Sequence, residues 1–561
     1  MRCAFAFLSL SSAINNGFTK PGRGWSSWYA APDGSQVTDA FIRSNSVALV
    51  TSGLAAKGYT FSNVDEGWLA GRHPNGTIFE DMGKFPSGMK ALGDYIKSIG
   101  LSYGLYTCRG TCQCSTDKYH GPGSHGYEVE DVNWIVAAGA TWLKVDSCCG
   151  SQAHAVAFSD YARFRDALNA TGVPVYFNLC GWSPWYAFPD PALNYTGGAS
   201  LGNSWRISGD GASYGAITAT MNILARVAVF GGGPSGTNDA DNVLGPHGTV
   251  GVITEAQARA QFLLWALAPS QLILGEDMTK ASAEYIETVG NEEMLAINYD
   301  TPFMGPARRV AGGDLTYPCA SAPSQAVAGV AALPCNASDP AQQWALDGAG
   351  GLSVAAPAGA LLSLTSCSNE DGAPLALFPA GWAGVNACDG ASWRFDKYNG
   401  SLLGAFGKCL DEYEMTTPRV DLWTCVPGAA NEAWAPAGSS FSRGLLINQD
   451  SKLCLAAVPL PPPAVCGNVW ARPLSDGSFA QVFVWNGEED GAVLCDAACF
   501  AAANMTAAKY RVRDLLTHAD LGEISAPLSW SANLSAGGSG AAYKFTPFSS
   551  VFSPSDVCCA K

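Results

Sequence analysis

Short apolar segments alternate with longer helix-like segments from about residue 20 to residue 300, and this alternation is the strongest constraint on the fold. Strands separated by helices pair in parallel, because each helix returns the chain to the starting end of the sheet. Strands are expected at residues 24–28, 59–64, 102–106, 141–145, 174–179, 204–208, 226–230 and 270–274. Helices are expected at residues such as 89–99, 129–140 and 158–170. Eight strands in this arrangement predict a (β/α)8 TIM barrel.

Polar and aromatic residues stand at the carboxyl ends of these strands, where TIM barrels carry their active sites. Asp65 and Glu66 are adjacent, and neighbouring like charges repel, so folding alone gives no reason for the pair. We therefore expect both carboxylates to bind a ligand. The residues expected at this face are Trp28, Asp65, Glu66, Tyr106, Asp146, Asp210 and Asp277.

Two carboxylates at the ends of different strands suggest glycosidase chemistry. Lys144 and Asp146 are two positions apart on one strand, so they point to the same side, and the ammonium is expected to keep Asp146 ionised as a nucleophile. Asp210 follows Arg206 at the end of another strand and supplies a second carboxyl group that can donate a proton. The competing explanation for either aspartate alone is an ordinary helix cap.

The composition changes after Pro302 to Ala, Gly, Pro, Ser and paired Cys, without the strand and helix alternation. Three loosely similar blocks, at 334–344, 387–395 and 408–434, resemble the repeats of a ricin-B-type β-trefoil lectin. The Gln-x-Trp motif of such repeats is seen at 342–344 and is weakened at 431–434. The resemblance implies that Asp411 and Trp423 contact sugar. The alternative is a disulfide-tied β domain that binds no sugar.

Alternating residues from 469 onward predict antiparallel strands. We divide the chain into a signal peptide at 1–13, a catalytic barrel at 14–305, a β-trefoil at 306–468 and a C-terminal antiparallel β-sandwich at 469–561. The segment at 1–13 has one Arg, then an apolar stretch, then small residues, but it is shorter than the usual signal peptide of roughly 15–30 residues.

Nineteen cysteines and seven Asn-x-Ser/Thr sequons predict the secretory pathway, with a secreted or vacuolar/lysosomal product. A zinc site is the rival explanation, but the Cys and His spacings match no zinc pattern. Cys319 and Cys335, like Cys409 and Cys425, are sixteen positions apart, and all four are expected in disulfides. Cys495 and Cys499 are expected to pair with each other. The sequons are Asn75, Asn169, Asn194, Asn336, Asn399, Asn504 and Asn533.

A formal net charge of −16 argues against nucleic acid or an anionic membrane as a partner, because both favour clustered Lys and Arg. The glycine-rich segment at 231–236 lacks the Lys-Ser/Thr of a phosphate-binding loop. The segment at 239–242 resembles the start of a calcium loop, but the required Gly and acidic residue do not follow. We therefore predict no cofactor and no metal, and a neutral glycan as the ligand.

Eight motifs occur in the order expected for glycoside hydrolase family 27, the α-galactosidase family, which this chain resembles. The resemblance covers residues 21–310 and resumes at 469, with the trefoil inserted between barrel and sandwich. The motifs are "GWSSW", "NVDEGW", "FPSGMKALGDYIKSIGLSYGLY", "PGSHGYE", "WLKVDSC", "NSWRISGD", "TNDADN" and "AINYD".

The resemblance implies a retaining mechanism in which Asp146 is the nucleophile and Asp210 is the acid/base. Such a mechanism requires the two carboxyl groups to lie about 5 to 5.5 Å apart. The resemblance also implies a disulfide from Cys148 to either Cys112 or Cys114. The residues implied to bind substrate or to position the catalytic pair are Trp28, Asp65, Tyr106, Lys144, Arg206 and Asp241.

Departures from the family pattern bear on specificity. Glu66 stands where the family usually has Asp, and its longer side chain is expected to intrude where galactose carries its C6 hydroxymethyl group. β-L-arabinopyranose lacks that group, so α-galactosidase and β-L-arabinopyranosidase are both kept as predictions, with α-galactosidase preferred. Trp185 is expected near the sugar, where its bulk disfavours an N-acetyl group at C2. A non-catalytic lectin is a further alternative, but the presence of both Asp146 and Asp210 argues against it.

Overall fold

The structure is a computed structural model. It describes residues 14–31, 36–114, 121–232, 236–248, 253–300, 305–317, 319, 326–365, 371–379, 392–395, 400–412, 420–426, 429–436, 443–459 and 466–548. The predicted signal peptide at 1–13 and the sequon at Asn399 lie outside the described residues.

The N-terminal half contains an eight-stranded parallel sheet of the TIM-barrel type, as the alternation predicts. The strand order is β10-β1-β2-β5-β6-β7-β8-β9, and a parallel bridge between Val243 and Leu274 joins the segment after β9 to β10. The strands are β1 (Arg23–Ser26), β2 (Phe61–Asn63), β5 (Ser102–Cys108), β6 (Trp142–Asp146), β7 (Tyr176–Cys180), β8 (Ser204–Arg206), β9 (Thr237–Asp239) and β10 (Leu272–Leu274).

Helices connect these strands and cover the sheet. Side-chain caps fix several of their N-termini: Ser213 begins α6, and Thr254 forms a capping box with Gln257 at the start of α7. The hairpin of β3 (Leu69–Arg72) and β4 (Ile78–Glu80) follows β2. The helices are α1 (Ser27–Ala30), α2 (Asp39–Thr51), α3 (Met89–Ser98), α4 (Glu128–Ala137), α5 (His154–Thr171), α6 (Tyr214–Val227), α7 (Glu255–Leu267), α8 (Ala283–Val289) and α9 (Glu292–Asn298).

One predicted strand is wrong. Residues 226–230 form the end of α6 and the short 3-10 helix η5 (Ala228–Phe230), and the strand of this unit is β9. A five-residue segment with four apolar residues is too short for its periodicity to distinguish a strand from the end of a helix. β9, in contrast, is three polar residues long, although all three are buried.

The described elements of the inserted block are β-strands and short 3-10 turns. Its described strands form two antiparallel sheets, in the orders β12-β23-β22-β21 and β13-β14-β15-β16-β20-β19-β18-β17. The strands are β12 (Gly329–Leu333), β13 (Trp344–Leu346), β14 (Leu352–Val354), β15 (Ala360–Leu364), β16 (Ala373–Phe378), β17 (Arg394–Phe395), β18 (Leu402–Leu403), β19 (Cys409–Glu412), β20 (Val420–Trp423), β21 (Trp434–Pro436), β22 (Leu446–Asn448) and β23 (Cys454–Val458).

Disulfides tie this block together in a pattern that the sequence spacing shows only in part. Cys409 pairs with Cys425, but Cys319 pairs with Cys466 and Cys335 pairs with Cys454. Of the two cysteine pairs spaced sixteen positions apart, only Cys409 and Cys425 therefore form a disulfide with each other. Both long-range bridges join the beginning of the block to its end.

The C-terminal part forms an antiparallel six-stranded sheet, in the order β11-β24-β25-β30-β27-β28, and a separate two-stranded sheet, β26-β29. β11 (Arg308–Ala311) pairs with β24, so the predicted boundary at 306 wrongly assigns β11 to the trefoil. Cys495 and Cys499 pair as expected. The remaining elements are β24 (Gly467–Pro473), β25 (Phe479–Trp485), β26 (Gly491–Cys495), α10 (Ala497–Ala502), β27 (Lys509–Asp514), β28 (Asp520–Ser525), β29 (Trp530–Leu534) and β30 (Ser539–Pro547).

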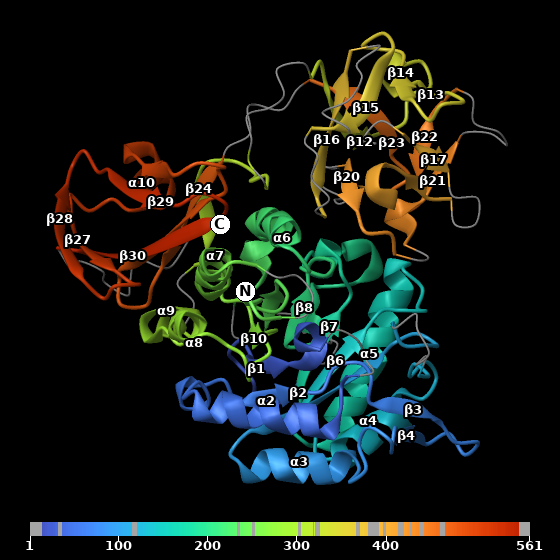
Figure 1. Ribbon diagram of the computed structural model, residues 1–561, viewed down its shortest axis with the longest axis vertical. Coiled ribbons are helices and arrows are strands. Elements are labelled where there is room, and N and C mark those ends of the chain that lie inside the picture. The colour runs from blue at the N-terminus through green and yellow to red at the C-terminus, as the bar shows by residue number, and fades with distance from the viewer. Residues whose placement is uncertain are drawn as a thin grey trace, which may run out of the picture.

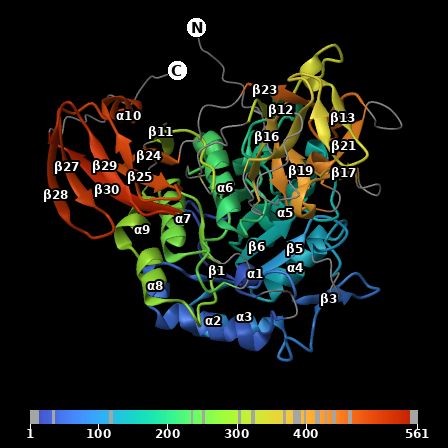
Figure 2. The ribbon, with the colours of Figure 1, turned by 45° about the horizontal axis from the view of Figure 1, so that its top comes forward.

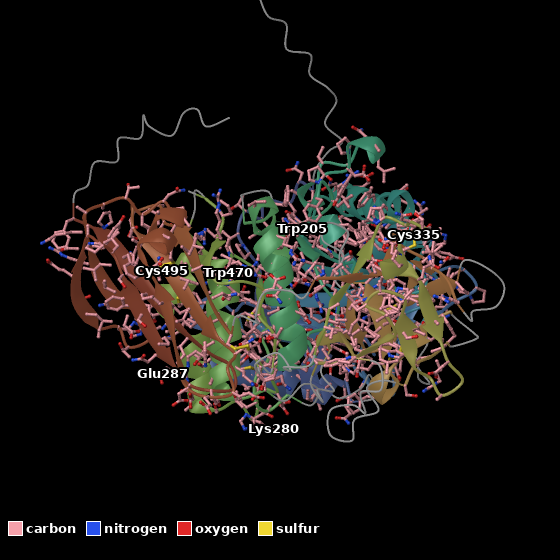
Figure 3. The ribbon with its side chains drawn as sticks, turned by 90° about the horizontal axis from the view of Figure 1, so that it is seen from above. Trp205, Lys280, Glu287, Cys335, Trp470 and Cys495 are labelled. Atoms are coloured by element: carbon pink, nitrogen blue, oxygen red, sulfur yellow. A yellow bond between two sulfur atoms is a disulfide. The ribbon has the colours of Figure 1, made fainter. Side chains whose placement is uncertain are left out.

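Helix α6 lies between the inserted block and the C-terminal sheet (Figures 1 and 2). On one side, Asn486 accepts a hydrogen bond from Tyr214 and donates one to Thr218. On the other side, Trp423 packs against Ala216. Figure 3 shows Cys335 of the block and Cys495 of the sandwich on opposite sides of the molecule. No helix among the described residues combines the length and apolarity that a bilayer crossing requires.

Candidate active site

Lys144 and two carboxylates form the centre of the site at the carboxyl ends of β2 and β6. The Nζ atom of Lys144 lies 2.9 Å from Oδ2 of Asp65 and 3.8 Å from Oδ2 of Asp146. The backbone N–H of Ser147 donates to Oδ1 of Asp146 at 2.9 Å. Lys144 therefore interacts most closely with Asp65 and only more weakly with Asp146.

Burial and charge oppose each other at this centre. Burial raises the pKa of Asp146, and Lys144 and the Ser147 N–H counteract the increase. Lys144 thus favours the ionised form of Asp146, as the sequence predicts, although burial raises the pKa of Asp146 above its ordinary value. Burial lowers the pKa of Lys144, but Asp65 and other negative neighbours raise it well above its ordinary value, so Lys144 is a cation.

Asp210 lies in the loop between β8 and α6, and side chains from β8 and from the short helix α1 hold it. The guanidinium of Arg206 donates to Oδ1 of Asp210 at 3.0 Å, and the indole N–H of Trp28 donates to Oδ2 at 3.1 Å. The Asp210 side chain is 43% exposed, whereas the whole Asp146 residue is only 6% exposed. The two carboxyl groups therefore have different environments, one buried and one open to solvent.

Asp241 fixes the other side of this loop. Its carboxylate pairs with Arg206 at 2.5 Å and accepts hydrogen bonds from the Tyr29 hydroxyl and from the backbone N–H of Gly211, each at 2.6 Å. Burial raises the pKa of Asp241 to about 6, and Arg206 opposes this increase. The sequence analysis missed Tyr29, although it directly follows Trp28.

Glu66 is buried beside Tyr106, with 2% of its surface exposed. The Tyr106 hydroxyl donates to Oε2 of Glu66 at 3.5 Å and lies 3.2 Å from Sγ of Cys108. The backbone N–H of Glu66 donates to Oδ1 of Asp65 at 2.8 Å. Asp65 and Glu66 therefore direct their carboxylates to different partners, Lys144 and Tyr106.

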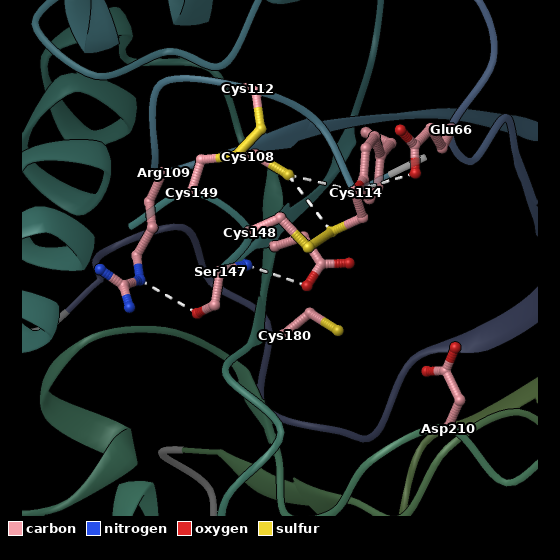
Figure 4. Close-up of a disulfide and its surroundings, with 12 residues drawn as sticks. Glu66, Cys108, Arg109, Cys112, Cys114, Ser147, Cys148, Cys149, Cys180 and Asp210 are labelled. Atoms are coloured by element: carbon pink, nitrogen blue, oxygen red, sulfur yellow. Dashed lines mark hydrogen bonds between the residues drawn. A yellow bond between two sulfur atoms is a disulfide. The ribbon is translucent and has the colours of Figure 1, made fainter. Parts of the chain in front are cut away.

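Two disulfides fix the loops around Asp146, and Figure 4 shows them together with Glu66, with Asp210 farther away at the lower right of the view. Cys148 pairs with Cys114, and Cys149 pairs with Cys112, so each of the two cysteines left open by the sequence has its own partner. Cys108 and Cys180 are buried free thiols. The described clusters that could hold a metal, Cys114-Asp146-Cys148 and Cys409-Cys425-Glu432, each contain two sulfur atoms that are already in disulfides.

Trp185 lies in η2 (Pro184–Tyr186), in the loop after β7, and lines a cavity of about 230 Å³ with His154 and Phe158. Its ring stacks on His154 at 4.1 Å and on Tyr186 at 3.8 Å between centroids. The sugar contact expected of Trp185 stays a prediction; its ring lines this cavity and packs against two neighbouring rings. Asp277 also has a local role: its carboxylate accepts from Thr279 and pairs with Lys280.

A smaller cavity of about 20 Å³, enough for one water molecule, lies below Lys144 and Asp65 inside the barrel. Asn178 donates to Oδ2 of Asp239 at 2.8 Å, and Gln271 accepts from Ser204. The sequence analysis does not identify this polar layer, because Asn178 is a single polar residue within an otherwise apolar strand segment. Apart from Ser204, these polar side chains line the same cavity as Lys144 and Asp65 and lie next to them inside the barrel.

Matches to known families fall on both sides of the inserted block. A model described as alpha galactosidase A matches residues 30–300, and one described as the alpha galactosidase C-terminal beta sandwich domain matches residues 467–542. A probable alpha-galactosidase of Dictyostelium discoideum is 34% identical over 300 residues, which are 52% of this chain and 72% of that protein. An alpha-galactosidase of Oryza sativa subsp. japonica is 34% identical over 292 residues, which are 52% of this chain and 66% of that protein.

Solved structures share the fold. The crystal structure of alpha-galactosidase I from Mortierella vinacea superposes with a TM-score of 0.59 at 20% identity and covers 95% of this chain and 98% of its own. A GH27-b-L-arabinopyranosidase from Geobacillus stearothermophilus in complex with arabinose has a TM-score of 0.56 at 14% identity, with the same coverage of 95% and 98%. At these identities the likeness concerns the fold alone.

Proposed function

This chain belongs to the α-galactosidase family of glycoside hydrolases, and from that premise we propose that it is a retaining exo-glycosidase that releases terminal α-D-galactosyl residues. The observation that carries the proposal is the contrast between two carboxyl groups at the ends of different strands. Asp146 is buried near the Lys144 ammonium, whereas Asp210 is partly exposed. A retaining glycosidase requires this division between a nucleophile and a proton donor.

In the proposed mechanism, the ionised carboxylate of Asp146 attacks the anomeric carbon. The bond from that carbon to the leaving oxygen breaks, and Asp210 donates its proton to that oxygen. A water molecule then gives a proton to Asp210 and attacks the anomeric carbon, which releases Asp146 and the sugar with its configuration retained. Arg206 and Trp28 orient Asp210 through their hydrogen bonds, and Lys144 holds Asp65 toward the sugar hydroxyls.

A β-L-arabinopyranosidase is the second candidate, and Glu66 is the observation that favours it. Glu66 is one methylene longer than the Asp usual in the family, and its side chain is buried near Asp65 and Tyr106. A carboxylate in this place restricts the space available to a C6 hydroxymethyl group. We keep galactose as the preferred substrate, because the family is named for that activity.

We propose that the inserted block is a ricin-B-type β-trefoil that holds the enzyme near polysaccharide. Its hydrophobic core supports a threefold repeat, because three buried tryptophans each donate an indole N–H to a leucine carbonyl. The pairs are Trp344 to Leu455 at 2.7 Å, Trp393 to Leu362 at 2.9 Å and Trp434 to Leu410 at 2.8 Å.

We propose the secretory pathway as the route of this protein. Six disulfides among the described residues support an oxidising compartment. Glycosylation at the sequons follows from that route as part of the same proposal.

The test is hydrolysis of 4-nitrophenyl α-D-galactoside and raffinose, with the configuration of the first product followed by NMR. We expect α-galactose to form first, and Asp146→Asn to abolish turnover on both substrates while the melting temperature stays unchanged. Initial formation of β-galactose would overturn the retaining mechanism. Turnover by Asp146→Asn at the wild-type rate would overturn the role of Asp146.

A further inference from the structure

A side chain of the inserted block contacts the loop that carries Asp210. Trp423, at the end of β20, is 7% exposed and forms a small buried apolar cluster with Ala216 and Ala219 of α6. In Figure 1 the inserted block lies beyond α6, at one end of the barrel. The sugar contact implied for Trp423 by the trefoil resemblance stays a prediction; the contact that the structure shows is with the barrel.

The contact reaches Gly209, the residue directly before Asp210. A Cβ atom added to Gly209 would lie 3.3 Å from Cζ2 and 3.4 Å from Nε1 of Trp423. Gly372 of the block approaches α6 in the same way, since a Cβ there would lie 3.2 Å from Cβ of Ala219. The barrel residues at these two contacts, Gly209, Ala216 and Ala219, are all small, and the Trp423 ring fits closely against them.

Hydrogen bonds hold the same loop from inside the barrel. The carbonyl of Gly209 accepts from Nη2 of Arg206 at 3.0 Å and from the Ser208 hydroxyl at 3.2 Å. On the far side of Asp210, the backbone N–H of Gly211 donates to Asp241. The Trp423 ring covers the outer side of the loop, and Asp210 itself is too exposed to be fixed by burial.

We propose that Trp423 is a positioning residue for Asp210, so that the inserted block completes the catalytic site. This inference rests on the proposed function, in which Asp210 protonates the leaving oxygen. A general acid acts only within hydrogen-bond reach of the atom that it protonates, and a small shift of its backbone therefore slows the step. Loss of the Trp423 contact allows Gly209 and Asp210 to move outward.

The test compares substrates that differ in their need for the proton. The sucrose oxygen of raffinose leaves only with protonation, whereas nitrophenolate leaves with little help. We expect Trp423→Ala to lower kcat/KM on raffinose by about 10-fold or more, mainly in kcat, and to change kcat/KM on 4-nitrophenyl α-D-galactoside by less than about 3-fold. Trp423→Phe, which keeps an aromatic ring, is expected to restore most of the raffinose activity.

Phe406→Ala is the matched control, because it removes a 51% exposed aromatic from the same block, and wild-type kinetics are expected. An equal loss on both substrates, or unchanged raffinose kinetics in Trp423→Ala, would overturn the inference. Failure of the wild-type protein to hydrolyse either substrate would instead overturn the proposed function. If Trp423→Ala does not fold, Gly209→Ala provides a second test, because it crowds the same contact from the barrel side. A loss of kcat/KM on raffinose but not on the nitrophenyl galactoside supports the inference. Any other result with Gly209→Ala overturns it.

Discussion

The indole nitrogen of Trp28 lies 3.1 Å from Oδ2 of Asp210, across 182 positions of sequence. This bond links the short helix after the first barrel strand to the loop after β8. We expect Trp28→Phe to lower kcat/KM on raffinose by about 10-fold, because the hydrogen bond that orients Asp210 is lost while an aromatic ring is kept. Steady-state kinetics and a thermal melt test this, and an unchanged kcat/KM would show that Arg206 alone orients Asp210.

Glu66 is expected to control the choice between galactose and L-arabinopyranose. Glu66→Asp shortens the side chain by one methylene and should shift the ratio of kcat/KM toward galactoside by about 10-fold. Nitrophenyl α-D-galactoside and β-L-arabinopyranoside provide the comparison, with Glu66→Gln as the control of equal length. A ratio that Glu66→Asp leaves unchanged would mean that Glu66 does not limit the space at C6.

Either of the two neighbouring disulfides beside Asp146 is expected to provide most of the stabilisation that the two provide together. Cys112–Cys149 and Cys114–Cys148 close loops of 37 and 34 positions between the same two segments. Replacing both pairs by Ser should lower the free energy of unfolding by about 3–4 kcal/mol, and replacing either pair alone by less than half of that.

Denaturant unfolding of the three disulfide variants measures this non-additivity. The comparison variant replaces Cys495 and Cys499, which are four positions apart in the sandwich, and should lower the free energy of unfolding by less than the double replacement does, because this disulfide closes a short loop. A large loss for either active-site pair alone would contradict the redundancy.

Glu276 is expected to make the fold more stable below neutral pH than above it. Its side chain is fully buried, and burial raises its pKa to about 7. Because the folded-state pKa is above the unfolded value of about 4.3, the folded state binds the proton more tightly, and this stabilisation is lost as pH rises from about 4 to 7.

Glu276→Gln keeps an acceptor for the backbone N–H of His247 and removes the titration. We expect the free energy of unfolding of this variant, relative to wild type, to increase by about 1–3 kcal/mol between pH 4.5 and pH 7.5. Urea titrations at a series of pH values test this, and a difference that does not depend on pH would exclude Glu276 as the titrating group.

The parallel sheet could be predicted from sequence because strand and helix periods are local. Periodicity is not informative where a segment is short: residues 226–230 are mostly apolar but helical, and β9 is polar but buried. Pairing between distant segments is also outside a local pattern, so β11 is assigned to the wrong domain and Cys319 is not matched with Cys466.

In the candidate site, too, the features that depend on local sequence could be predicted, and those that depend on contacts between distant segments could not. Asp146, Lys144 and Arg206 are identified because strand ends meet at one face, and the structure brings their side chains together with Asp65 and Asp241. The contact of Trp423 with Gly209 joins two domains, and no periodicity in either domain encodes it.

The Cα atoms of Cys319 and Cys466 are 5.4 Å apart, although 147 positions separate them in the sequence. The chain thus leaves the sandwich and returns to it at almost one point. A gene encoding this protein could gain or lose the intervening segment in one event, because β11 and β24 would still meet. If Trp423 positions Asp210 as proposed, the inserted block contributes to catalysis, and deleting it would lower the rate at which the barrel protonates the leaving oxygen.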